Sequence, residues 1–170
     1  MILIGLGTNL PLSNQRSGQN LLAEALETLQ NRGLEIRAVS RFYRSEPVPP
    51  SDQNWYVNAV AEIGSSLDPL PLLEVLHAVE TAFGRVRTLR NAARTLDLDL
   101  LAYGQVIRPS DGPAPHLPHP RMAGRAFVLY PLNDLAPHWC HPVTGASLCD
   151  LIAALPKDQR IDLLELPLDS

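Results

Sequence analysis

The amino-acid sequence predicts an α+β sandwich, in which helices pack against an antiparallel β-sheet. Two observations support this fold class. Two segments place apolar residues every three or four positions, as amphipathic helices do, whereas the segments around them alternate apolar and polar residues, as half-buried strands do. The resulting order is strand, helix, strand, strand, helix, strand, which is the βαββαβ order of a ferredoxin-like sheet, and a C-terminal extension follows it.

The chain begins with an apolar run at residues 2–6, which predicts a short buried strand that ends at the glycines of "GLGTNL". This segment lacks the full glycine-rich fingerprints of phosphate-binding loops, so we interpret it as a plain strand end. The first helix follows. Leu22, Leu26 and Leu29 have helical spacing, and Gly33 is placed to end the helix.

Two strands are predicted between the helices. Residues 34–43 form the first, and the run "EPVPP" after it predicts a loop, because proline lacks a backbone N–H donor and has a fixed φ angle. The second strand is "NWYVNAVAEI", in which apolar and polar residues have a period of two. Tyr56 and Asn58 therefore point to the same face of this strand.

A second helix and a fourth strand complete the predicted sheet. Asp68 is placed as the N-cap of the helix, Pro69 as its first residue and Gly84 as its end. The fourth strand lies in "RTLDLDLLAYG", where leucine and aspartate alternate. We expect both helices to cover one face of the sheet and to leave the other face open, so that polar residues of several strands converge there.

The C-terminal region has a different pattern. Residues 108–121 hold five of the sixteen prolines and therefore predict an extended loop. Residues 125–130 are a short apolar segment to which the pattern assigns no element. Ser147 and Asp150 have the spacing of a capping box, which predicts that a helix begins there.

Composition limits the classes of function. With 170 residues, 45% of them hydrophobic and 19% charged, the chain is expected to form one globular domain over residues 1–170. The formal net charge of −4 argues against broad nucleic-acid binding. The sequence has no basic leader and no apolar run near the roughly 20 residues of a membrane helix, so we expect a cytoplasmic protein that does not bind membranes.

Two aspartates on the last strand define a candidate site. Asp97 and Asp99 are two residues apart, so their side chains share a face at a spacing of roughly 6.6 Å while leucines face the other side. By alternation alone, a solvated outer face is the ordinary interpretation. Four arginines lie just upstream, namely Arg85, Arg87, Arg90 and Arg94. Arginine binds phosphate oxygens bidentately, and Mg²⁺ takes carboxylate together with phosphate, so the group indicates a site for a metal-bound phosphate compound.

Three other candidates have a structural interpretation beside the functional one. Tyr56 can stack on a flat heterocycle while Asn58 pairs with its edge, or it covers an edge of the core. His119, in the proline-rich "LPHPR", can reach a phosphate, or it is an exposed loop histidine. Glu80 belongs either to the site or to the solvated surface of the second helix.

Taken together, the motifs resemble one family, the 6-hydroxymethyl-7,8-dihydropterin pyrophosphokinases of folate biosynthesis. The resemblance covers about residues 2–137 and rests, in chain order, on "GLGTNL", "FYRSEPV", "QNWYVNAV", "VETAFGRVR", "RTLDLDLLAYG", "LPHPR" and "GRAFVLYPLNDLAP". It implies the ferredoxin-like fold and transfer of the terminal diphosphate of ATP to 6-hydroxymethyl-7,8-dihydropterin, with release of AMP. Two Mg²⁺ ions are the implied cofactors, and we expect a monomer that binds these two small molecules.

The resemblance assigns roles at the phosphate end of the site. Asp97 and Asp99 match aspartates that hold two Mg²⁺ ions on the ATP phosphates. Arg85, Arg87 and Arg94 match arginines of a loop that contacts ATP and closes over it. No dedicated general base is evident, and we interpret Asp97 as the group that assists the attacking hydroxyl.

Three further residues match the nucleotide side of the family's site. His119 matches a histidine that reaches ATP phosphate, Arg125 a further arginine, and Glu80 an acidic residue of the active-site region. The chain departs from the family in the arginine loop, which commonly holds Trp-Gly-Pro. Here the loop reads "RNAARTLD", with Asn91 near the tryptophan position and one residue fewer.

The remaining matches concern the pterin. Tyr56 and Phe127 match two aromatic residues that sandwich the pterin ring, and Asn58 matches the residue that pairs with its edge. Ser45 and Val48 match positions that line the same pocket. Two other functions remain as alternatives: a non-catalytic pterin or nucleotide binder, and a metal-dependent nucleotidyltransferase.

Overall fold

A computed structural model describes residues 1–9, 17–49, 51–85 and 95–164. Its six-stranded sheet is built from β1 (Ile2–Thr8), β2 (Glu35–Val39), β3 (Tyr43–Ser45), β4 (Tyr56–Gly64), β5 (Asp97–Tyr103) and β6 (Ile161–Leu163). The strands are ordered β5-β1-β4-β3-β6, and β2 pairs with the other end of β4. Every pairing is antiparallel. Because β2 and β3 both pair with β4, they are two parts of the single strand predicted there, and the βαββαβ fold is confirmed.

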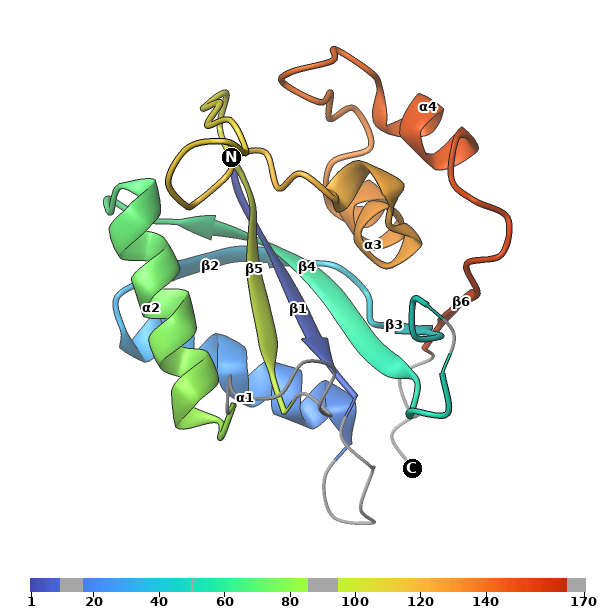
Figure 1. The fold of residues 1–170 in the computed structure, drawn as a ribbon. Coiled ribbons are helices and arrows are strands. Elements are labelled where there is room, and N and C mark those ends of the chain that lie inside the picture. Colours follow the sequence, from blue (N-terminus) through green and yellow to red (C-terminus); the bar gives the residue numbers. More distant parts are fainter. Residues whose placement is uncertain (10–16, 50, 86–94, 165–170) are drawn as a thin grey trace.

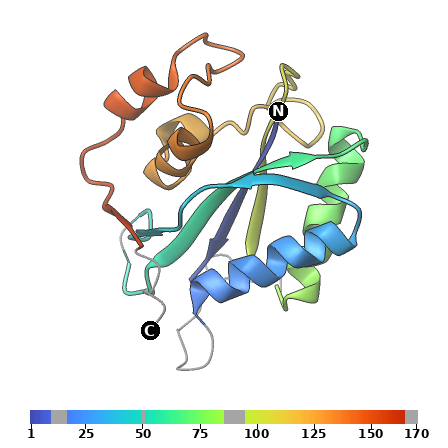
Figure 2. The same ribbon diagram turned by 180° about the vertical axis from the view of Figure 1, so that it is seen from behind.

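Two helices, α1 (Gly18–Asn31) and α2 (Pro69–Ala82), cover one face of the sheet (Figures 1 and 2). Their buried leucines pack against the inward side chains of β1, β4 and β5 in one apolar cluster. Gly33 and Gly84 have φ angles of 87° and 82°, the left-handed conformation that ends helices, as the sequence predicts.

The first turns of these helices differ. In α1, the Ser17 hydroxyl accepts the N–H of Asn20 at 3.1 Å and so caps the helix. In α2, Asp68 is at the predicted N-cap position, but its side chain makes no cap hydrogen bond. Pro69 is the first helical residue, where its fixed φ angle suits the helix and its missing N–H costs nothing.

The opposite face of the sheet is partly covered, so the expectation of an open face is wrong for part of the sheet. α3 (Ala126–Leu135), which follows a 3₁₀ turn at Met122–Gly124, lies over β4, and α4 (Leu148–Ala153) packs beside it (Figure 1). A second apolar cluster joins Leu3 and Val60 of the sheet to Leu129 of α3. The predicted capping box is present, because the Ser147 hydroxyl accepts the Asp150 N–H at 3.1 Å.

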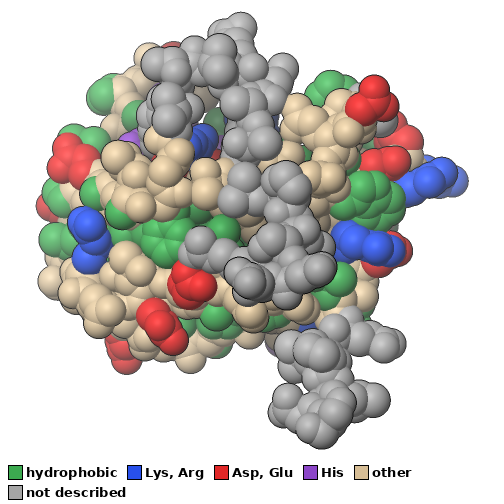
Figure 3. Space-filling view, turned by 90° about the horizontal axis from the view of Figure 1, so that it is seen from below, with side chains coloured by type: hydrophobic (Ala, Val, Ile, Leu, Met, Phe, Trp, Pro, Cys, Tyr) green, Lys and Arg blue, Asp and Glu red, His purple; other side chains and the backbone are tan. Residues whose placement is uncertain are grey.

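The molecule therefore has three layers, with the sheet between two helical layers. α3 leaves uncovered the part of the sheet where β1 ends and where β4 and β5 begin. On the side of the molecule seen from below in Figure 3, acidic and basic side chains are interspersed among hydrophobic ones. Within the described ranges, no helix is both long enough and apolar enough to span a membrane.

Candidate active site

A cavity of about 360 Å³ lies over the uncovered part of the sheet, between the strands, the loop after β3 and the N-terminal end of α3. We call it the sheet cavity. Its described lining residues are Gly5, Leu6, Gly7, Ser45, Glu46, Pro47, Val48, Pro49, Ser51, Gln53, Tyr56, Asn58, Ala59, Asp97, Asp99, Leu101, Arg121, Arg125, Phe127 and Val128. Eight of the residues predicted from the sequence are among them. The prediction that the polar residues of β4 and β5 converge is therefore confirmed.

The register of the strands explains this convergence. Gly7 of β1 pairs with Asn58 of β4 on one side and with Asp97 of β5 on the other, and Gly5 pairs with Asp99. Directly paired residues of antiparallel strands point to the same face. Since β1 has glycine at both positions, no side chain rises between the carboxylates and Asn58. A Cβ atom on Gly7 would lie 3.2 Å from Asn58 Oδ1, so the two glycines form the floor of the cavity, a role the sequence analysis missed.

Asp97 and Asp99 form the carboxylate end of the sheet cavity. Their side chains are 19% and 37% exposed, while Leu96, Leu98 and Leu100 are buried against the helices on the other face. The predicted alternation is thus correct, but the two carboxylates line a concave surface that other charged groups share. An ordinary solvated outer face does not describe this arrangement.

Arg85 bridges Asp97 to a buried glutamate. Its Nη1 donates to Asp97 Oδ1 at 2.5 Å and also to Glu80 Oε1. Glu80 is only 1% exposed, and its Oε1 accepts the backbone N–H of Leu98 at 2.8 Å. Glu80 is therefore neither a surface charge nor a cavity residue. It lies behind the carboxylate end, where it fixes Arg85 and the first residues of β5.

Arg125 links the carboxylate end to an aromatic ring. It is the N-cap residue of α3, and its guanidinium carbon lies 5.3 Å from the centre of the Phe127 ring. Its Nη1 is 3.8 Å from Asp99 Oδ2. One cation is thus shared between a ring face, which attracts positive charge, and a carboxylate.

His119 lies close to the same charges. The His119 N–H donates to Leu101 O at 2.7 Å, which ties the proline-rich loop to β5. Burial lowers the pKa of His119, and nearby Arg125 and Arg121 lower it further, although Asp99 acts in the opposite direction. The imidazole is therefore neutral at pH 7. Its Nδ1 accepts the Arg121 N–H at 3.2 Å, so the ring proton is on Nε2 and is available to an acceptor.

The aromatic end of the sheet cavity is formed by Tyr56 and Phe127 with polar groups beneath them. Asn58 Nδ2 donates to Ser45 Oγ at 2.9 Å, and both side chains are at least 96% buried. This bond fixes the amide so that Oδ1 lies over Gly7. Val48 is 60% exposed at the rim, on the loop that follows β3.

The chain is similar in sequence to proteins of one known family. The family model described as 7,8-dihydro-6-hydroxymethylpterin-pyrophosphokinase (HPPK) matches residues 3–137. The chain belongs to the HPPK family. A 2-amino-4-hydroxy-6-hydroxymethyldihydropteridine pyrophosphokinase of Pseudomonas aeruginosa is 44% identical over 155 residues, which cover 91% of each chain. The enzyme of the same name from Haemophilus influenzae is 42% identical over 133 residues, covering 78% of this chain and 79% of the relative.

A solved structure supports the fold. The crystal structure of Plasmodium falciparum HPPK-DHPS with pteroate superposes with a TM-score of 0.68 at 14% sequence identity. The alignment covers 89% of this chain and 41% of that one, so the chain spans about two fifths of the length of this neighbour. At this level of identity the match concerns the HPPK fold alone.

Some predicted HPPK site residues lie outside the described ranges. These are Arg87 and Arg94, together with Arg90 and Asn91 of the same loop. Conversely, Arg121 and Gln53 line the sheet cavity but are not among the residues predicted from the sequence. Both were within quoted motifs, Arg121 as the last residue of "LPHPR" and Gln53 as the first of "QNWYVNAV". Position within a motif was the available signal for each.

The carboxylate end has the donor set for Mg²⁺. Among the residues that the structure describes, no three His, Cys, Asp or Glu side chains converge on one point to hold a metal. Mg²⁺ does not need such a cage, because it commonly takes one or two carboxylates and completes its shell with phosphate and water. Asp97 and Asp99, on one face and partly exposed, fit this pattern for a metal that arrives with a phosphate compound.

Proposed function

We propose that this chain transfers the terminal diphosphate of ATP to the hydroxymethyl group of 6-hydroxymethyl-7,8-dihydropterin, as a Mg²⁺-dependent pyrophosphokinase of folate biosynthesis. Membership of the HPPK family supports the reaction. The single observation that carries the residue assignment is the sheet cavity itself, which joins two carboxylates to a pair of aromatic residues. β5 and β4 are separated by β1, so the two ends are about 10 Å apart, a distance that suits a pterin beside a triphosphate.

At the carboxylate end, we assign Asp97 and Asp99 as the groups that would hold two Mg²⁺ ions on the ATP phosphates. When bound, the ions neutralise charge on the transferring diphosphate. Arg85 and Arg125 add positive charge beside the same carboxylates. His119, neutral and protonated on Nε2, donates a hydrogen bond to a phosphate oxygen. Arg87 and Arg94 stay predictions from the resemblance.

At the aromatic end, we assign Tyr56 and Phe127 to the two faces of the pterin ring. Asn58 presents its amide to the edge of the ring, held in one orientation by Ser45. A heterocycle edge carries donors and acceptors in a fixed pattern, and an amide fixed in this way can match that pattern. Val48 covers the ring from the rim of the cavity.

The reaction needs positioning more than covalent help from the protein. The hydroxymethyl oxygen attacks the β-phosphorus of ATP, the bond from that phosphorus to the α,β-bridging oxygen breaks, and AMP leaves. The hydroxyl proton passes to Asp97, the carboxylate that lies nearest to Asn58 in the strand register. We further propose that the chain acts as a monomer and as a single domain over residues 1–170, since the sheet cavity brings together residues of distant segments of one chain.

Two alternatives make different predictions. A non-catalytic pterin binder would need only the aromatic end, and the paired carboxylates beside two arginines argue against it. A metal-dependent nucleotidyltransferase would release diphosphate from ATP. The proposed reaction releases AMP, so the products separate the two enzymes.

Product analysis tests the proposal. The purified chain, incubated with ATP, Mg²⁺ and 6-hydroxymethyl-7,8-dihydropterin, is expected to form AMP and the pterin diphosphate in equal amounts, measured by ³¹P NMR and chromatography. Asp97→Asn keeps the size of the side chain and removes its charge, and turnover should fall by roughly 10²-fold or more. Diphosphate in place of AMP, or no product at all, would refute the proposal.

A further inference from the structure

Gln159, in the segment between α4 and β6, holds the start of α3 in place. Its side-chain Oε1 accepts the Ala126 N–H at 2.8 Å, and its Nε2 donates to Gly124 O at 2.7 Å. The two bonded groups flank Arg125. The Arg125 side chain makes no cap hydrogen bond of its own, so Gln159 supplies an acceptor to the first N–H of α3 from 33 residues away.

The residues after Gln159 hold the opposite wall of the sheet cavity. β6 pairs with β3, with Ile161 opposite Ser45. The Glu46 N–H donates to Arg160 O at 3.2 Å, and Arg160 Nε is 3.9 Å from the Glu46 carboxylate. One short segment, residues 159–163, therefore contacts both the start of α3 and the strand that leads into the loop at the rim of the cavity.

We propose that Gln159 is a positioning residue for the aromatic end of the sheet cavity, and that residues 159–163 fix the separation of its two walls. The inference deepens the proposed function, on which it rests. Phe127 is the second residue of α3 and Arg125 its N-cap, so both move with the backbone that Gln159 holds. The segment lies outside residues 3–137, which the family model matches.

Both hydrogen bonds depend on the amide group. A glutamine flipped by 180° would place its NH₂ against the Ala126 N–H and its oxygen against Gly124 O, so only the observed orientation satisfies both partners. Gln159→Met keeps the length of the side chain and removes both bonds. Gln159→Glu keeps an acceptor for the Ala126 N–H and loses the donor to Gly124 O.

The test compares binding of the two substrates. In Gln159→Met we expect the KM for 6-hydroxymethyl-7,8-dihydropterin to rise roughly threefold to tenfold, the effect of one or two lost hydrogen bonds. The KM for ATP should change less, by about twofold at most. Arg125 lies on the backbone that Gln159 holds, but Asp97 and Asp99 lie on β5, and Arg85 lies just after α2. Gln159→Glu should restore part of the pterin affinity. Melting temperatures recorded for each variant identify any general loss of folding.

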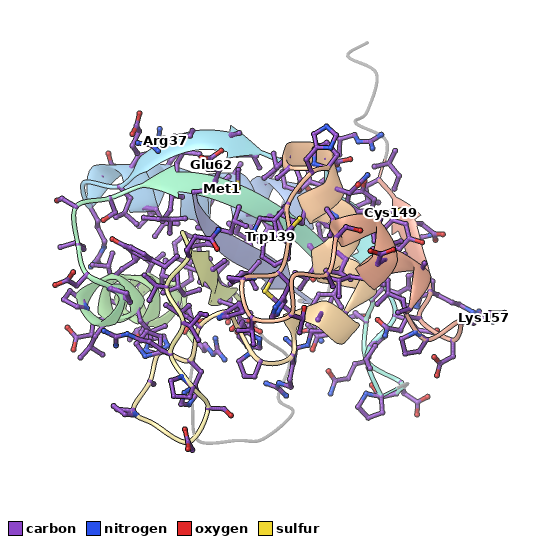
Figure 4. All side chains as sticks on the ribbon, turned by 90° about the horizontal axis from the view of Figure 1, so that it is seen from above. Met1, Arg37, Glu62, Trp139, Cys149 and Lys157 are labelled. Atoms are coloured by element: carbon purple, nitrogen blue, oxygen red, sulfur yellow. The ribbon has the colours of Figure 1, made fainter. Side chains whose placement is uncertain are left out.

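Lys157→Met is the matched control, because Lys157 lies two residues earlier, is exposed and points outward from the molecule (Figure 4). Phe127→Ala separates this inference from the proposed function. If Phe127→Ala leaves pterin binding unchanged, the assigned pterin site is wrong. If Phe127→Ala weakens pterin binding but Gln159→Met does not, or if Gln159→Met raises both KM values equally, the role of Gln159 is wrong and the site assignment stands.

Discussion

Glu80 supports the carboxylate end of the sheet cavity from behind, because it is 1% exposed and bonds to both Leu98 and Arg85. The sequence places Glu80 on the second helix and allows a solvated position. Its burial depends on how α2 lies against β5, a contact between segments that sequence periodicity does not specify. Asp97 and Asp99, by contrast, could be placed on one face from the sequence, because strand alternation is a local property.

A substitution at Glu80 should lower stability. Glu80→Gln keeps an acceptor for the Leu98 N–H and loses the negative charge that Arg85 contacts. Hydrogen bonds to charged groups are strong when buried, so we expect the free energy of unfolding to fall by about 1–3 kcal/mol in urea titrations. Glu74→Gln, at an exposed position on the same helix, is the matched control and should change stability by less than about 0.5 kcal/mol. Equal effects of the two variants would contradict the buried role.

Gly7 makes a second prediction at this scale. In Gly7→Ala, the new Cβ would lie 3.2 Å from Asn58 Oδ1, so the amide must shift from the orientation that Ser45 imposes. We expect the KM for the pterin to rise about tenfold, with a smaller change in the KM for ATP. In Gly5→Ala the nearest contact is Leu101 at 3.5 Å, an ordinary distance, so its effect on the pterin should be smaller. If Gly5→Ala raises the KM for the pterin more than Gly7→Ala does in steady-state assays, Gly7 is not part of the floor.

Among the helices that cover the sheet, α3 is the one that the sequence did not reveal. Its apolar run is short, and Pro131 inside the helix is a residue that usually breaks helices. Tertiary contacts stabilise it instead, through the apolar cluster with Leu3 and Val60 and through Asp134 near its C-terminal end. The four predicted strands, α1 and α2 could be predicted because each has its own periodicity, whereas β6 has only three residues. α3 could not, because it is stabilised by residues distant in the sequence.

Asp134 attaches α3 to the sheet. Its carboxylate accepts hydrogen bonds from the Tyr43 hydroxyl at 3.0 Å and from Arg41 Nη2 at 2.6 Å. Burial by itself raises the pKa of Asp134, but the hydrogen bonds from Arg41 and Tyr43 outweigh it and leave the pKa below its usual value of 3.8. The folded state therefore favours the ionised carboxylate. This contribution is present above the unfolded pKa and is lost as pH falls through the lower, folded pKa.

The prediction at the scale of this element is a pH-dependent stability difference. At pH 7, Asp134→Asn should lower the free energy of unfolding by about 1–3 kcal/mol. An amide oxygen is a weaker hydrogen-bond acceptor for Arg41 and Tyr43 than a carboxylate is. The difference from the unmodified protein should shrink below about pH 4, where the wild-type carboxylate becomes protonated. Denaturant titrations at pH 7, 5 and 3 measure this. A difference that stays constant over the whole range would exclude the charge of Asp134 as its cause.

For the whole molecule, the sequence predicts the topology better than the layers. The order of strands and helices along the chain follows from local patterns and the resemblance, and the structure adds the spatial order β5-β1-β4-β3-β6. The second helical layer and the segment at residues 159–163 depend on non-local contacts. The sheet cavity depends on both local patterns and non-local contacts. Its floor and carboxylates lie on predicted strands, whereas one wall is α3. Eight residues that line the cavity could therefore be named from strand patterns and the resemblance, whereas the glycine floor and the bonds from Gln159 could not.

The sheet cavity unites segments that are far apart in the chain, so an unfolded chain has no such site and each ligand should stabilise the folded state. At about 100 times its Kd, a ligand adds roughly 2.7 kcal/mol, which for a domain of this size raises the melting temperature by about 5–10 °C. We expect a non-hydrolysable ATP analogue with Mg²⁺, and then the pterin, to give successive increases in the melting temperature measured by scanning calorimetry.

Asp97→Asn should lose most of the increase in melting temperature that requires Mg²⁺, because the variant removes the charge of one carboxylate of the assigned metal pair. It should keep most of the pterin increase, because Tyr56, Asn58 and Phe127 are unchanged. If the Mg²⁺-dependent increase persists in Asp97→Asn while Phe127→Ala abolishes it, the two ends of the cavity have been assigned the wrong way round.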